Sequence, residues 1–365
     1  VFNSTTTSTA VRRAVQGSNN WLMGPYQNRA MFYAGAWVHQ HADQLSTTPV
    51  LSAAVANTNA ANNGFYFHNG KNMAPAGVTA TDVPNWLHLG GGGAAPAERF
   101  GGSVAELIVY KKDMTAAERQ RIESYLAVKY GITIDQTTPS HYVNSNGDVI
   151  WDHLFNGIYK NNIFAIGRDN GSALNQTQSK SANTDAISIS NPSALSDGDF
   201  LFLSDNGLST GPLAQLGLPG GAVAGSQRVW SVSKTGTVGT VDITIFSTEA
   251  NPLLLVDNDN NGVFETALTP ASSSGNYYTY SGLSLNNYAK LKLGYLTIAY
   301  PGGISAGLHL WLKAANAVVG EGTAQTWIDY GPGGYNASQS SPARRPAFTP
   351  SSQLFNRNPV LNFDL

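Results

Sequence analysis

The sequence contains no cysteine, which excludes disulfide bonds, a thiol nucleophile and cysteine metal ligands. Charge is scarce as well: 12% of the residues are charged, and a formal net charge of -2 provides no positive field for nucleic acid. No run of about 18 apolar residues occurs, so no membrane span is predicted. The sequence begins at Val1 without a signal peptide, so we expect a chain that was processed or cut from a longer one. The absence of cysteine also fits a secreted bacterial protein.

The composition favours β-structure. Glycine is abundant, with 38 residues, and Asn, Ser and Thr are common, whereas lysine and glutamate are few. Such a composition predicts sheets joined by turns, in an all-β protein with room for two or three domains in 365 residues. Runs of β-forming residues predict strands at residues 21–23, 30–38, 50–55, 64–68, 86–89, 104–110, 200–203, 228–232, 240–246, 252–256, 277–283 and 289–296.

One short helix is predicted, at about residues 115–130. Thr115 and Glu118 have the T-x-x-E spacing of a capping box, in which both side chains satisfy backbone groups at the helix start. Gly131 stands where a left-handed C-terminal cap is expected. Helical spacing predicts a core-facing stripe made of Ile122, Tyr125, Leu126 and Lys129. The side chains expected in water are Arg119, Arg121 and Glu123.

The stretch from Gly101 to Asp135, GGSVAELIVYKKDMTAAERQRIESYLAVKYGITID, resembles a known closing strand and helix. These belong to concanavalin A-like (laminin-G-like) jelly rolls in large secreted surface proteins of the Bacteroidetes type. Phe65–Asn69 (FYFHN) stands where such domains carry an F-x-NG hairpin. Residues 140–220 resemble a β-rich module that commonly follows these jelly rolls, through the segments NSNGDVIWD, NNIFAIGRDNGSALNQTQSKS and ISISNP.

Residues 301–365 resemble the opening of a jelly roll of the same family. The segments LHLWLKAANAVVG, TWIDYGPGGYNASQ, RRP and NPVLNFDL follow the family order LWLKAD, W-D-SG-N-A-Q, RP and P-V-NFDG. Two positions depart from that pattern: Ala315 replaces an acidic residue, and Leu365 stands where glycine would follow Asp364. The sequence therefore ends with the start of a domain whose remainder lies at its beginning.

This order predicts three regions. They are the C-terminal two-thirds of a jelly roll at 1–134, an antiparallel β-sandwich at 135–300 and the N-terminal third of a jelly roll at 301–365. Neither partial jelly roll could bury its apolar sheet face alone, and unpaired edge strands attract other strands. The two parts could meet within one chain, between neighbouring chains, or between repeats of a longer chain. We favour neighbours, because the links at 131–139 and 300–303 are too short to act as long tethers.

The resemblance therefore implies a structural or adhesive unit of an extracellular bacterial filament or giant repeat surface protein. Its partners would be copies of itself, since a head-to-tail contact that does not close generates a filament. The apolar residues expected to insert into the neighbouring copy are Leu308, Leu310, Leu312, Val360, Leu361 and Phe363.

Enzymatic activity is not expected. Glucanases with a jelly-roll fold carry two catalytic glutamates in an E-x-D-x-x-E pattern, and none of the seven glutamates here has that spacing. The sequence also lacks the H-E-x-x-H zinc motif and the glycine-rich phosphate loop. Shared fold alone does not establish catalysis.

The segment DNDNNGVFE, residues 257–265, contains the sharpest binding motif. Its alternating oxygen side chains followed by Gly262 match the first half of a calcium loop. The ligands would be Asp257, Asp259, Asn261, the Val263 carbonyl and Glu265, the last directly or through water. Leu268 stands where the bidentate acid of a complete loop would be, so a polar β-turn is the alternative. Calcium is the only cofactor that the sequence suggests.

A carbohydrate-binding, lectin-like module is the alternative function. Most of the seven Trp and sixteen Tyr should fill the core of a β-sandwich, because large aromatic residues dominate such cores. Trp21 and Tyr26, in a Gly/Pro/Asn-rich segment, are the best candidates for stacking on a sugar. His39 and His41 alternate with Asp43 along a strand end, but two histidines without a third ligand predict no firm metal site.

Overall fold

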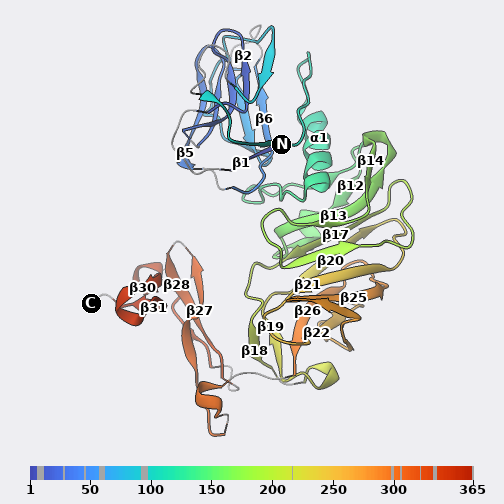
Figure 1. The fold of residues 1–365 in the computed structure, drawn as a ribbon, viewed down its shortest axis with the longest axis vertical. Coiled ribbons are helices and arrows are strands. Elements are labelled where there is room, and N and C mark those ends of the chain that lie inside the picture. Colours follow the sequence, from blue (N-terminus) through green and yellow to red (C-terminus); the bar gives the residue numbers. More distant parts are fainter. Residues whose placement is uncertain are drawn as a thin grey trace. The chain divides into compact units, whose positions relative to one another are not determined.

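The structure, a computed structural model, describes residues 1–5, 12–27, 29–44, 47–56, 62–91, 98–215, 217–296, 300–304, 306–320, 322–331 and 335–363. For residues 42–44 it describes the backbone alone. Regular structure within these ranges is mostly β, and the strand pairs with a defined register are antiparallel (Figure 1). Two α-helices occur in these ranges, α1 (Ala116–Tyr130) and α2 (His153–Asn156), and neither is long and apolar enough to cross a membrane. The predicted all-β fold class is confirmed.

The chain divides into two compact units. The first unit comprises Val1–Ser204, Val232–Ile243 and Gly282–Asn287, and the second comprises Asp205–Ser231, Thr244–Ser281 and Tyr288–Leu365. Both units contain residues of the predicted middle region, so this division differs from the three regions expected from the sequence. The boundaries at 134 and 300 stay a prediction.

Three small sheets form the N-terminal part of the first unit. A five-stranded sheet has the order β5-β4-β3-β2-β9, β6-β7-β8 form a second sheet, and β1 pairs with β10. These strands are β1 (Phe2–Ser4), β2 (Val15–Gly17), β3 (Leu22–Tyr26), β4 (Arg29–Tyr33), β5 (Trp37–Gln44), β6 (Ser52–Val55), β7 (Phe65–His68), β8 (Lys71–Asn72), β9 (Leu87–Leu89) and β10 (Gly102–Val104). All three sheets contribute to one core, which includes Phe2, Val15, Phe32 and Tyr66.

Helix α1 begins and ends where the sequence predicts. The Thr115 hydroxyl accepts a hydrogen bond from the Glu118 N–H at 3.2 Å, and the Glu118 carboxylate accepts one from the Thr115 N–H at 2.9 Å. This reciprocal pair is the predicted capping box. Gly131 ends the helix in the left-handed conformation, with φ of 64°, and its N–H bonds to the Ala127 carbonyl.

The helix packs on two sides of the first unit. Leu126 contacts a small cluster with Leu51, whereas Ala127 and Val128 join the core of the strands that follow the helix. Glu123, which was expected in water, is only 5% exposed. The β7–β8 turn at Gly70 lies beside its carboxylate. That prediction is wrong because helical periodicity did not reveal the second packing surface.

Two larger sheets follow the helix and form the expected β-sandwich. One has the order β14-β13-β17-β20-β26-β19-β18, with β22 bonded to β26 and β23, and the other has the order β15-β16-β21-β25-β24. A separate pair consists of β11 (Tyr142–Val143) and β12 (Val149–Trp151). The strands of the nine-stranded sheet are β13 (Asn161–Asp169), β14 (Leu174–Gln176), β17 (Phe200–Asp205), β18 (Pro212–Ala214), β19 (Ala224–Ser226), β20 (Trp230–Thr235), β22 (Leu253–Asp257), β23 (Thr266–Leu268) and β26 (Lys290–Tyr295). Those of the five-stranded sheet are β15 (Ser179–Lys180), β16 (Ile187–Ser190), β21 (Val241–Phe246), β24 (Ser272–Ser274) and β25 (Tyr277–Leu283).

The C-terminal part of the second unit is a separate sheet with little core of its own. Its order is β27-β28-β30-β31, with β29 beside β28. The strands are β27 (Leu312–Gly320), β28 (Thr323–Asp329), β29 (Ala337–Ser338), β30 (Ala347–Ser352) and β31 (Asn358–Asn362). Among the described residues from 300 to 363, Ala324 and Ile328 are the only buried apolar side chains. A sheet normally buries one apolar face, so this one has a face that its own strands leave open.

Candidate functional site

The six predicted assembly residues all lie in this C-terminal part, and none of them is buried. Leu312 belongs to β27, and Val360 and Leu361 belong to β31; all three are half-buried. Leu308, Leu310 and Phe363 lie outside strands, because β27 begins only at Leu312. Leu310 is 46% exposed and Phe363 is 68% exposed.

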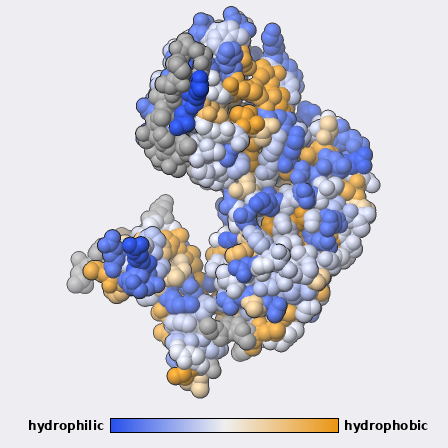
Figure 2. Space-filling view, viewed as in Figure 1, coloured by the Kyte–Doolittle hydropathy of each residue, from blue (hydrophilic) through white to orange (hydrophobic). Residues whose placement is uncertain are grey.

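The surface around these residues is partly apolar. Figure 2 shows hydrophobic side chains on the face of the region that Figure 1 labels β27 to β31. Trp327 on β28 and Phe363 have ring centroids 6.4 Å apart, which places two large aromatic rings beside the half-buried residues of β31. Leu354 is 93% exposed and Phe355 is 62% exposed, so both add to this apolar surface.

A second open apolar segment lies in the first unit, directly after β10. The sequence predicts a strand from Val104 to Tyr110, but β10 ends at Val104. The Val1 backbone still bonds to Ala105 and Glu106, whereas residues 107–110 have no strand partner in the described part of the chain. Val109 is 61% exposed and Tyr110 is 49% exposed. The predicted strand is therefore too long for this structure, because a β-former without a neighbouring strand has no ladder to join.

The predicted calcium loop joins β22 to β23 in the second unit. Oxygen atoms of Asp257, Asp259 and Glu265 lie within 4.8 Å of one another, so the structure brings these three carboxylates together. Asp257 is 1% exposed, whereas Asp259 and Glu265 are exposed. Val263 is 58% exposed.

The same loop is also stabilised by its own hydrogen bonds. The Gly262 N–H donates to the Asp257 carboxylate at 3.0 Å, and the Asn261 N–H donates to it at 3.1 Å. The Asn261 amide also donates to Asp259 and to Glu265, at 3.0 and 2.8 Å. These contacts are those of a polar turn, and a cation would have to displace the Asn261 amide to gain all three carboxylates. Calcium binding therefore stays a prediction.

The two predicted sugar-stacking residues have different environments. Trp21 is 8% exposed and packs edge-on against Phe32 in the core, so its ring offers no open face and a ligand role for it is wrong. Tyr26 is half-buried, and its ring centroid lies 5.4 Å from that of Trp37. The ring centroids of Trp37 and Tyr33 are 5.2 Å apart. Trp37 is 36% exposed. Sequence reasoning missed Trp37, since nothing local distinguishes it from the core tryptophans.

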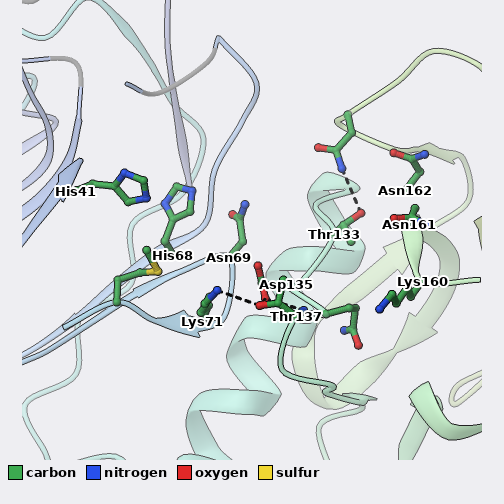
Figure 3. A pocket seen from close by; sticks show the side chains of 13 residues that line it. His41, His68, Asn69, Lys71, Thr133, Asp135, Thr137, Lys160, Asn161 and Asn162 are labelled. Carbon is green, nitrogen blue, oxygen red and sulfur yellow. Dashed lines mark hydrogen bonds between the residues drawn. The ribbon is translucent and has the colours of Figure 1, made fainter. Parts of the chain in front are cut away.

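A pocket of about 570 Å³ lies within the first unit (Figure 3). Its walls come from the end of β5, the β7–β8 hairpin, the segment after α1 and the start of β13. The polar lining residues include His41, His68, Lys71, Asp135, Lys160 and Asn162. Lys71 donates to the Thr137 hydroxyl at 2.9 Å, which connects the hairpin to the segment after the helix.

Three histidines gather beside this pocket, and two of them, His41 and His68, line it. The ring centroids of His39 and His41 are 5.8 Å apart, and those of His41 and His68 are 6.0 Å apart. Burial, together with the neighbouring His41 and His39, lowers the pKa of His68 to about 4. Burial and His41 also lower the pKa of His39. The sequence offered His39 and His41 but not His68, because only the tertiary contact between β5 and β7 brings it near. The Asp43 side chain lies outside the described part.

Residues 303–307, with the sequence GISAG, have the G-x-S-x-G spacing of a nucleophile elbow. That motif requires a preceding strand and a following helix. The described residues around it form a short 3-10 turn (Pro301–Gly303) and then β27, so the required context is missing there. Ser305 itself lies outside the described residues. The spacing therefore carries no argument for hydrolysis.

Comparison with known proteins finds one family. Residues 118–289 match a family described as "Domain of unknown function (DUF8202)", which spans a little under half of the chain. The match begins inside α1, in keeping with the packing of Ala127 and Val128 on the strands that follow. No curated protein matches the chain, and no solved structure matches it.

Proposed function

We propose that this chain is a structural unit of an extracellular bacterial assembly, a filament or a giant repeat surface protein. In this assembly the C-terminal sheet of one copy completes the N-terminal sheets of the next copy. The observation that carries the proposal is the C-terminal sheet itself, five strands with two buried apolar side chains among the described residues. The segment at residues 107–110 belongs to no strand and exposes Ile108, Val109 and Tyr110, so it offers the neighbouring copy an apolar segment with which to pair.

Burial of these side chains provides the driving force. Full burial of a Leu, Val or Phe side chain stabilises by about 1.5–3 kcal/mol. The six assembly residues are now half-buried or exposed, so covering them would recover a substantial part of that amount for each. A contact that also pairs strand edges would exceed the ~1,600 Å² of a standard interface and behave as obligate.

The contact would join two different surfaces of the same chain. Such a heterologous contact leaves one free surface at each end of a growing series, so it propagates unless the geometry closes a ring. Successive units joined in one long polypeptide would use the same contact as separate chains. The resemblance to surface-protein jelly rolls supports the extracellular location.

Cysteine cross-linking tests this contact, since the chain has no cysteine of its own. The double variant Val109→Cys with Leu361→Cys is treated with a short bis-maleimide and run on a denaturing gel. A ladder of dimers, trimers and larger species is expected, because each copy would carry both halves of the contact. Leu361→Cys combined with Leu154→Cys, at a 73% exposed position of α2, is the matched control and should give no ladder. If the Val109→Cys, Leu361→Cys variant yields only monomers, with or without a cross-link inside the chain, pairing between copies is refuted.

Glycan binding is the second candidate function, and the exposed ring of Trp37 beside Tyr26 and Tyr33 favours it. Adjacent aromatic side chains with one open face suit stacking on a sugar ring. Titration calorimetry against a panel of oligosaccharides tests this role. Trp37→Ala should abolish any binding, whereas Trp86→Ala, at an even more exposed tryptophan of the same unit, should not.

A further inference from the structure

Two strands of the first unit bring three imidazoles together. His39 and His41 are two residues apart on β5 and so point to the same side of the strand, and His68 ends β7. The rings of His39 and His41 are nearly perpendicular, at 79°, and those of His41 and His68 are tilted by 49°. Figure 3 shows the His41 and His68 rings next to each other at the pocket wall.

Two buried nitrogen atoms in this cluster make no hydrogen bond within the described part of the chain. They are Nε2 of His39 and Nδ1 of His68. His39 is 8% exposed, and its ring is hydrogen-bonded to the backbone of Met73. A backbone bond at one ring nitrogen fixes the tautomer and leaves the other nitrogen as an acceptor, which is the usual state of a metal-binding histidine. Buried polar atoms normally have partners, so two orphaned nitrogens in one cluster require an explanation.

We propose that His39, His41 and His68 bind one divalent transition-metal ion, with Zn²⁺ as the natural occupant. Imidazole nitrogen suits zinc, copper and nickel, whereas calcium and magnesium prefer oxygen ligands. Three protein ligands leave a fourth position, which water from the adjoining pocket can fill. Coordination requires neutral imidazoles, because only an unprotonated ring nitrogen can bind the metal.

Binding requires a modest rearrangement of the side chains. Nitrogen ligands of a tetrahedral zinc ion lie about 3.3 Å apart, as Zn–N bonds of about 2.0–2.1 Å imply. Among the described residues, only Asp257, Asp259 and Glu265 already have ligand atoms that all lie within 4.8 Å of one another. His39 is held by its bond to Met73 and by stacking on Tyr66, so the His41 and His68 rings must rotate to direct their nitrogens towards its Nε2. The ion would then connect β5 and β7, which belong to different sheets of the same core.

Metal titration of the full chain, with any affinity tag removed, tests the proposal. Cobalt(II) serves as the spectroscopic probe, and zinc binding is measured by competition and by metal analysis after dialysis. We expect one equivalent of metal, the visible absorption bands of four-coordinate cobalt, and a higher melting temperature in zinc than in chelator. His41→Gln and His68→Gln should each weaken binding at least tenfold.

His88→Gln is the matched control, because His88 is exposed in the same unit and outside the cluster; it should bind as the unchanged chain does. Asp257→Asn separates this site from the β22–β23 loop and should also leave zinc binding unchanged. If His68→Gln fails to fold, the His41→Gln variant, at a half-buried position, tests the proposal instead. Dialysed protein that retains no zinc and shows no cobalt bands, or histidine variants that bind as tightly as the control, would overturn the proposal.

Discussion

At the scale of single residues, Glu123 shows how burial changes the chemistry of one side chain. Burial raises its pKa to about 7, although the Arg119 guanidinium lies 3.4 Å away and acts in the opposite direction. Arg119 is itself held over the Phe67 ring, 3.8 Å from its centroid. The carboxyl group is thus confined between α1 and β7, where water cannot stabilise its charge.

This burial predicts a pH dependence of stability. Below about pH 4.5 the carboxyl group is protonated in the folded and the unfolded state, so it does not change the free energy of unfolding. Between about pH 4.5 and 7 it ionises in the unfolded state first, so the folded state loses stability, and the full penalty is reached above pH 7. The penalty reaches about 3 kcal/mol if the full shift is expressed. Glu123→Gln should therefore be more stable than the unchanged chain at pH 8 and equal to it near pH 4.5, in urea denaturation at both pH values.

The difference between variant and unchanged chain isolates this effect from the histidines. The lowered pKa of His68 acts the other way, since it removes stability as pH falls from about 6.5 towards 4. Glu118→Gln is the control, because hydrogen bonds from Lys112 and Thr115 lower the pKa of Glu118 to about 2. That variant should gain no stability at pH 8. A Glu123→Gln variant with the same pH profile as the unchanged chain would show that the carboxyl group is not buried as described.

At the scale of elements, local signals were sufficient where the structure depends on neighbours in sequence. The α1 ends follow from the Thr115–Glu118 capping box and from Gly131, and β25 has the predicted bounds Tyr277–Leu283. The expected strand at residues 104–110 failed because a strand needs a partner. His68 and Glu123 were missed for a related reason: both owe their surroundings to elements far away in sequence.

The loop between β22 and β23 carries a prediction of its own. If Asp257, Asp259 and Glu265 bind calcium in the folded state alone, a calcium concentration 100-fold above Kd stabilises by about 2.7 kcal/mol. The melting temperature should then be higher in calcium than in chelator, by a few degrees. Asp259→Asn should remove the difference, whereas Asp185→Asn, at an acid paired with Lys180, should preserve it. Equal melting curves of the unchanged chain in both buffers would leave only a polar turn.

At the scale of the whole molecule, two apolar surfaces are left exposed, although a folded protein normally buries such surfaces or covers them with a partner. One is the C-terminal sheet, and the other is the segment at residues 107–110. The inverted order of the motifs predicted an incomplete C-terminal part, whereas residues 107–110 were expected to belong to a strand. The predicted sandwich of residues 135–300 has a well-buried interior, with Trp230, Phe202 and Ile243 fully enclosed, so it should fold without the C-terminal sheet.

The most direct measurement is light scattering on the full chain and on a chain truncated after Tyr300, over a range of concentrations. We predict that the full chain forms polydisperse species far above its 38.6 kDa mass, growing with concentration. The truncated chain should be a monomer with an intact sandwich, as circular dichroism and a cooperative melting transition would report. A full chain that stays a monodisperse monomer, or a truncated chain that still forms filaments, would contradict assembly through the C-terminal sheet.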